Sequence, residues 1–193
     1  MDSDQTPRLS LVETGPEVPV VTSAERRLAV EHWLLSTLPG PGRDRARMEW
    51  QEQEWALLPL GTLFAAVRLP ERVVHAVART DNPLMVDEFL AAALDDNPVI
   101  HDPLGHRFYA LVPASMPRRY GPAAQEWRDY GVEILGSDAF LGVPRVDAEV
   151  LDTRTQASYW AVPMPSAAML CEPLAVARLL AAAARRLGAE PDA

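Results

Sequence analysis

The strongest constraint on the fold is a turn signal between two apolar runs near the middle of the chain. Residues 99–101 and 106–112 are rich in apolar side chains, and the sequence Asp102-Pro-Leu-Gly105 lies between them. Asp at the first position, Pro at the second and Gly at the fourth are typical of a type I β-turn. The pattern therefore predicts a β-hairpin, and with it an antiparallel pair of strands.

Other strand-like runs also occur in neighbouring pairs. Residues 56–60 and 63–69 flank Gly61-Thr62, and residues 132–135 and 139–143 flank residues 136–138, so both pairs are predicted to be hairpins. A further strand is predicted at 158–163. Helices are predicted from the Thr22–Glu25 capping box, Pro70, Asn82, Pro122 and Pro173, while residues 43–55 suit either a helix or a loop. Paired strands favour an α+β fold, with a largely antiparallel sheet covered by helices on one face.

The domain boundaries follow from where periodicity begins and ends. Residues 1–21 contain Asp, Gln, Pro and Gly with little periodicity, which predicts a disordered tail. Residues 22–188 are expected to form one domain, and residues 189–193 a short second tail. The sequence has no apolar run of the roughly 18 residues that a membrane span requires, and its N-terminus does not resemble a signal peptide. The expected location is therefore the cytoplasm, without membrane partners.

Composition excludes several kinds of chemistry. All 18 basic residues are arginine, so a P-loop lysine and a lysine Schiff base are both excluded. The excess of 27 acidic residues gives a net charge of −9, which disfavours broad non-specific DNA binding. Cys171 is the one cysteine, which excludes an internal disulfide and a cysteine-based zinc site. The richness in Arg, Ala and Pro indicates a high-GC, actinobacterial genome.

Two groups of residues have the composition of a metal site. His101 and His106 flank the predicted turn, where cross-strand pairing would bring their rings together beside Asp102. The alternative is that both are exposed polar residues and that Asp102 forms the turn. Asp147 and Glu149 have the alternate spacing of a metal-binding strand, but they lie in a predicted loop, where solvation is the simpler explanation. No metal, other cofactor or catalytic residue is predicted.

Arginine pairs are the preferred candidates for ligand contacts. Arg107 shares a strand face with Tyr109, and Arg118-Arg119 precede Tyr120, so each could meet a phosphate or an acidic partner. Trp160 lies on a predicted strand, where an exposed indole would stack a base and a buried one would pack against a helix. A third arginine cluster comprises Arg43, Arg45 and Arg47. The candidate anion or ligand contacts are Arg107, Tyr109, Arg118, Arg119, His101, His106 and Trp160.

Several motifs between residues 54 and 172 resemble a known family. They are Trp55-Ala-Leu-Leu-Pro-Leu-Gly61, Phe64-Ala-Ala-Val-Arg-Leu-Pro70, residues 98–113, Gly131-Val-Glu-Ile-Leu-Gly136, Phe140-Leu-Gly-Val-Pro144 and Tyr159-Trp-Ala-Val-Pro163. They resemble actinobacterial proteins grouped with the N-terminal domain of bifunctional DNA primase–polymerases. The resemblance implies an α/β domain around a sheet, with divalent metal, nucleotides and template as ligands. The family's activity also implies an acidic pair on a strand, whereas the run 64–69 has no acid and Ala65 stands where one is expected.

Three functional hypotheses follow. The first is a non-catalytic primase–polymerase-like accessory or regulatory protein that binds nucleotide or single-stranded nucleic acid. The second is an acidic protein–protein interaction module with no role in nucleic-acid binding. The third is a metal-dependent enzyme using His101, His106 and Asp102, or Asp147 and Glu149.

Overall fold

The computed structural model describes residues 22–188, so the tails predicted at 1–21 and 189–193 lie outside the described residues. The helices are α1 (Ser23–Leu35), α2 (Gly40–Gln53), α3 (Glu71–Ala78), α4 (Pro83–Ala93), α5 (Met116–Arg119), α6 (Gly121–Arg128) and α7 (Pro173–Leu187). The strands are β1 (Trp55–Pro59), β2 (Phe64–Pro70), β3 (Val99–Asp102), β4 (Arg107–Pro113), β5 (Glu133–Leu135), β6 (Phe140–Pro144) and β7 (Tyr159–Val162).

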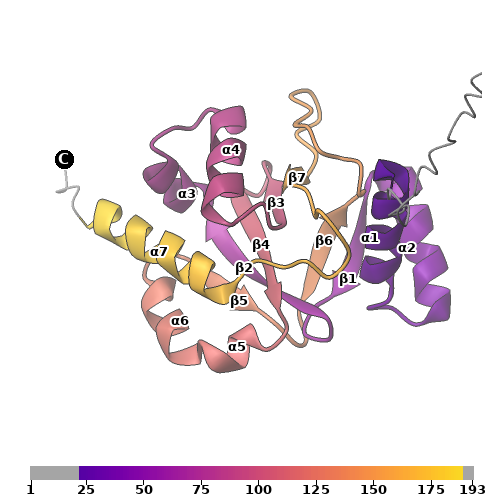
Figure 1. Cartoon of the computed structure of the whole chain (residues 1–193), viewed down its shortest axis with the longest axis horizontal. Helices are drawn as coiled ribbons and strands as arrows, with labels where there is room; N and C mark the ends of the chain where they lie inside the picture. The colour runs from indigo at the N-terminus through magenta and orange to yellow at the C-terminus, as the bar shows by residue number, and fades with distance from the viewer. Residues whose placement is uncertain (1–21, 189–193) are drawn as a thin grey trace, which may run out of the picture.

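The described strands form two antiparallel sheets (Figure 1). A five-stranded sheet has the order β5-β2-β4-β3-β7, and a separate two-stranded sheet pairs β1 with β6. Strands β3 and β4 form the hairpin predicted around Asp102-Pro-Leu-Gly105, with His101 opposite Phe108. The predicted α+β class with a largely antiparallel sheet is therefore confirmed.

The other two predicted hairpins are wrong. Strand β1 pairs with β6, while β2 pairs with β4 and β5, so neither Gly61-Thr62 nor residues 136–138 joins hydrogen-bonded neighbours. Both connections instead carry the chain from one sheet to the other, and they cross in contact. The Leu60 N–H donates to the Ala139 carbonyl at 2.9 Å, and a Cβ at Gly61 would lie 2.5 Å from the Ser137 nitrogen. These two four-residue links, 60–63 and 136–139, therefore cross in contact between the sheets.

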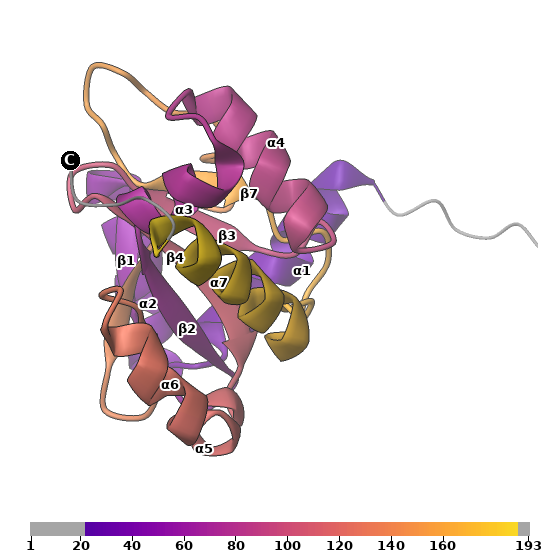
Figure 2. The ribbon, with the colours of Figure 1, turned by 90° about the vertical axis from the view of Figure 1, so that its left-hand side faces the viewer.

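Both faces of the five-stranded sheet are covered, where the sequence predicted one. In β2, Ala65, Val67 and Leu69 are buried against the layer that contains α3, α4 and α7. The alternate residues Phe64 and Ala66 are buried against α1, α2 and the β1–β6 sheet. Figure 2 looks onto the sheet through the first layer, with α7 in front. The central strands are therefore apolar on both faces, as their continuous apolar sequence requires.

Local signals place the helices well. The Thr22 hydroxyl accepts from the Glu25 N–H, and the Glu25 carboxylate accepts from the Thr22 N–H, which confirms the capping box. Asn82 caps α4, and α7 has the predicted limits. The charged stretch after Pro39 is helical, because Pro41 occupies the first turn of α2, where its missing N–H costs nothing. None of the described helices is long and apolar enough to cross a bilayer.

Candidate functional site

The predicted arginine contacts do not converge. Arg107 begins β4, whereas Arg118 and Arg119 lie in α5, beyond the far end of that strand. The seven residues of β4 place Arg107 about 20 Å from the end of the strand that leads to Arg118 and Arg119. All three side chains are exposed, and none forms an ion pair with any residue between 22 and 188. These arginines are therefore separate surface charges rather than parts of one site.

The two aromatic candidates have different surroundings. Tyr109 is half-buried on the sheet face opposite Phe108, and it lines a groove beside the hairpin turn. Trp160 is only 1% exposed, and its indole N–H donates to the Arg145 carbonyl at 3.0 Å. Trp160 therefore has no free face for stacking a base, and instead it fixes the backbone of the loop after β6.

The two predicted histidines meet at a carboxylate that sequence reasoning missed. His101 Nε2 lies 2.8 Å from Glu71 Oε1, and His106 Nδ1 lies 2.9 Å from Glu71 Oε2. Asp102 instead accepts from the Gly105 N–H at 3.0 Å, so it forms the turn. Residues 22–188 contain no group of three or more His, Cys, Asp or Glu side chains arranged to hold a metal ion.

Glu71 and His101 belong to a larger hydrogen-bonded group, which we call the Asp87 network. Its members are Asp87, Tyr159, His101, Glu71 and His106. The Tyr159 hydroxyl lies 3.3 Å from His101 Nδ1 and 3.0 Å from Asp87 Oδ2. His101 and Tyr159 are buried, and the His101 ring stacks on Phe108 with 3.9 Å between centroids. Asp87 is half-buried against Tyr159.

Burial decides the direction of the pKa shift at Asp87 and His101, but not at Glu71. It raises the pKa of Asp87 to about 7, although the Tyr159 hydrogen bond acts in the opposite direction. Burial also lowers the pKa of His101, against the pull of Glu71. For Glu71, burial acts to raise the pKa, but the hydrogen bonds and charges of His101 and His106 together outweigh it and leave the pKa lowered.

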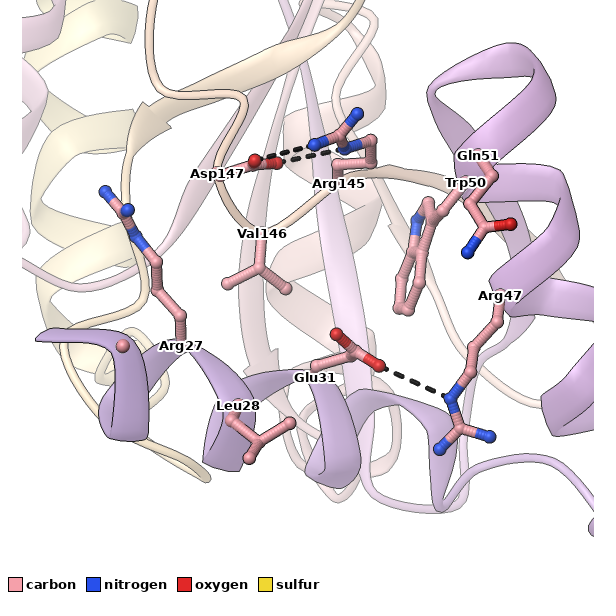
Figure 3. A pocket seen from close by; sticks show the side chains of 10 residues that line it. Arg27, Leu28, Glu31, Arg47, Trp50, Gln51, Arg145, Val146 and Asp147 are labelled. Atoms are coloured by element: carbon pink, nitrogen blue, oxygen red, sulfur yellow. Dashed lines mark hydrogen bonds and ion pairs between the residues drawn. The ribbon is translucent and has the colours of Figure 1, made fainter.

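A cleft of about 500 Å³ lies between α1, α2 and the loop after β6 (Figure 3). We call it the arginine cleft, because Arg27 of α1, Arg47 of α2 and Arg145 of the loop all line it. Its other walls include the ring of Trp50 and the apolar side chains of Leu28 and Val146. The sequence indicated Arg47 as part of a cluster, but it gave no signal that Arg27 and Arg145 would join it.

Each arginine of the cleft has a carboxylate partner. Arg145 binds Asp147 through two hydrogen bonds of 3.0 and 2.7 Å, and Asp147 raises the pKa of that guanidinium. Arg27 lies 2.9 Å from Glu149, and Arg47 lies 3.2 Å from Asp44 and 3.4 Å from Glu31. Asp147 and Glu149, which the sequence analysis weighed as a metal pair against a solvated loop, are thus separate partners of two arginines. The three arginine side chains remain 40–51% exposed, so their ion pairs stay open to solvent.

A second depression, the hairpin groove, has a volume of about 490 Å³. It is lined by the start of β1, the hairpin turn, the exposed edge of β6 and residues 155–158. Its apolar and aromatic walls include Trp55, Leu104 and Tyr109. Its charged lining residues are Glu54 and Asp102, both acidic, so the groove has the opposite electrostatic character to the arginine cleft.

Known proteins provide no relative to compare with this geometry, because no protein-family model, no curated protein and no solved structure matches the chain.

Proposed function

We propose that this protein is a non-catalytic, primase–polymerase-like accessory or regulatory factor of the actinobacterial cytoplasm that binds a nucleotide or single-stranded nucleic acid in the arginine cleft. One observation carries the proposal: three arginine side chains from separate segments line one cleft, although the chain has a net charge of −9. The absence of an acid from the run Phe64-Ala-Ala-Val-Arg-Leu69 supports the non-catalytic part.

The carboxylate partners do not prevent ligand binding. Exposed ion pairs contribute only about 0–1 kcal/mol each, so a phosphate can replace a carboxylate at low cost. Guanidinium groups bind phosphate with two parallel hydrogen bonds, which makes the exchange favourable for a ligand with several negative charges. The apolar wall of Leu28, Val146 and Trp50 adds surface for the planar base of a nucleotide.

The backbone of the cleft is already in place for this exchange. The indole N–H of Trp50 donates to the Val143 carbonyl at 2.9 Å, and this bond fixes α2 to β6. The Arg145 N–H donates to the Glu54 carbonyl at 3.0 Å, while the Arg145 carbonyl accepts from Trp160. Binding therefore requires rotation of exposed side chains but no movement of strands, which keeps its entropic cost low.

Calorimetric titration tests the proposal with four probes: ATP, inorganic tripolyphosphate, adenosine and an oligothymidylate. We expect ATP and the oligonucleotide to bind, with affinity that falls as salt rises. Arg47→Gln should weaken binding by about tenfold or more, because a hydrogen bond to a charged group is lost. Arg118→Gln, a matched exposed arginine outside the cleft, should leave the Kd unchanged. The proposal fails if no phosphate-bearing probe binds, or if both variants weaken binding equally.

The hairpin groove favours a second candidate function, an acidic module that binds a protein partner. The combination of Glu54 and Asp102 with Trp55 and Tyr109 suits an arginine or lysine side chain, which pairs with carboxylates and stacks on aromatic rings. The expected partner is therefore an extended basic segment with apolar neighbours. A synthetic Arg-Leu-Arg-Leu peptide should bind, its Glu-Leu-Glu-Leu counterpart should not, and Glu54→Gln should weaken the first. Equal binding of both peptides would rule this function out.

A further inference from the structure

The Asp87 network joins three consecutive elements of the chain, α3, α4 and β3, to the distant strand β7. Asp87 comes from α4, Tyr159 from β7, His101 from β3 and Glu71 from the start of α3, and His106 extends it to the hairpin turn. The Tyr159–Asp87 contact spans 72 residues, and the His101–Tyr159 contact spans 58. Through Tyr159, the network links the exposed surface of α4 to the buried face of the sheet.

Counting protons shows that the network needs one more than its ordinary state at neutral pH provides. Three contacts must each contain one proton: Glu71–His101, His101–Tyr159 and Tyr159–Asp87. A neutral imidazole supplies one and a phenol supplies one, while ionised carboxylates only accept. The third proton must therefore sit on Glu71, on His101 or on Asp87. Without it, two lone pairs face each other across one buried contact.

The environment selects Asp87 as the site of the extra proton. Glu71 faces two imidazoles, which favour its ionised form, and burial disfavours a charged His101. Within residues 22–188, Asp87 has the phenol of Tyr159 as its hydrogen-bond partner, and burial stabilises its neutral form. In this state the Asp87 carboxyl donates to Tyr159, Tyr159 donates to His101 Nδ1, and His101 Nε2–H donates to Glu71. All three contacts are then satisfied.

We propose that the Asp87 network is a proton-operated latch, which holds α4 against the sheet while it contains the extra proton and loosens α4 when that proton leaves. After deprotonation, the Tyr159 hydroxyl turns to the ionised Asp87, and His101 Nδ1 loses its donor. The contact that then fails, His101–Tyr159 at 3.3 Å, joins β3 to β7. Helix α4 loosens for a different reason: the ionised Asp87 carboxylate is half-buried, and outward movement of α4 returns its charge to water. Besides the members of the latch, the charged and titratable groups that act on the pKa of His101 are His75 and Asp102.

The latch has a definite sign and pH range. The pKa of Asp87 is about 7 in the folded protein and 3.8 in the unfolded chain, so the folded state binds the proton more tightly. Its contribution to stability is complete below pH 4, falls as pH rises, and is lost above pH 7. Over this range, the equilibrium constant for unfolding should rise by up to about tenfold per pH unit because of this group alone.

Asp87→Asn is the informative substitution. An asparagine amide donates to Tyr159 at every pH, which keeps one proton in each of the three contacts. The variant should therefore lack the pH dependence due to Asp87 between pH 4 and 7, and at pH 8 it should be more stable than the wild type towards urea. Glu88→Gln, on the exposed neighbour, removes the same charge and should leave the pH dependence unchanged.

Nitrogen-15 NMR of the histidine rings supplies an independent measurement. The Nδ1 signal of His101 should shift with a midpoint near pH 7 in the wild type and stay constant in Asp87→Asn. Hydrogen exchange of α4 should be faster at pH 8 than at pH 6 in the wild type alone. Tyr159→Phe, which removes the central hydroxyl, should also abolish the Nδ1 shift. A pH-independent Nδ1 signal in the wild type, or an Asp87→Asn variant with the wild-type pH dependence, would overturn the latch.

Discussion

Gly61→Ala tests the crossing between the two sheets. Gly61 has φ +91°, and an added Cβ would meet the Ser137 nitrogen at 2.5 Å and its Cα at 2.6 Å. The left-handed backbone costs an alanine roughly 1–2 kcal/mol. Overpacking against backbone atoms adds typically about 1–3 kcal/mol. The smaller entropy of the unfolded alanine chain offsets about 0.4–1 kcal/mol. The net loss of stability should therefore be about 1–5 kcal/mol.

Urea unfolding followed by tryptophan fluorescence measures this loss. Gly40→Ala is the matched control, because nothing lies within 4 Å of the added Cβ and the residue begins α2. The control should be neutral or stabilising by up to about 1 kcal/mol. Ser137→Gly in the Gly61→Ala background should restore little, since two of the three nearest atoms belong to the Ser137 backbone. A Gly61→Ala protein as stable as the wild type would refute the close crossing.

Three further substitutions or reactions test separate parts of the molecule. Trp160→Phe should lower the free energy of unfolding in urea by about 1–3 kcal/mol, because it leaves a cavity and removes the hydrogen bond to Arg145. It should also weaken ligand binding in the arginine cleft, and unchanged stability would contradict the role given to Trp160. Cys171 is fully buried, and burial raises the pKa of its thiol to about 12. Alkylation of Cys171 should therefore proceed only as fast as the protein unfolds. Rapid labelling of the folded protein would show that the thiol is accessible to solvent. Asn82→Ala should cost about 1 kcal/mol through loss of the α4 cap, whereas Asn82→Asp should retain most of it.

Local patterns made several parts of the fold predictable. The hairpin of β3 and β4 followed from Asp102, Pro103 and Gly105, because a turn depends on four consecutive residues. The starts of α1, α4 and α7 followed from capping residues or proline at the first helical turn. Each of these signals depends on a few consecutive residues, so it can be read directly from the sequence.

The features that the sequence did not predict depend on residues that are far apart in the chain. Gly61-Thr62 suits a tight hairpin locally, but β1 finds a better partner in β6, more than 80 residues later. The arginine cleft depends on Arg27 reaching Glu149 across 122 residues, and the latch depends on Tyr159 reaching Asp87. No spacing rule connects such positions, because their distance is fixed by how sheets and helices pack.

The sequence by itself determined the α+β class, the starts of several helices, the central hairpin and the exclusion of lysine chemistry. These depend on composition and on interactions between near neighbours. Only the tertiary structure decided which strands pair, which arginines share a cleft, and that His101 lies between Glu71 and Tyr159. Such contacts arise when the two faces of one sheet bury apolar residues from segments far apart in the chain, and the polar side chains are brought together by that burial.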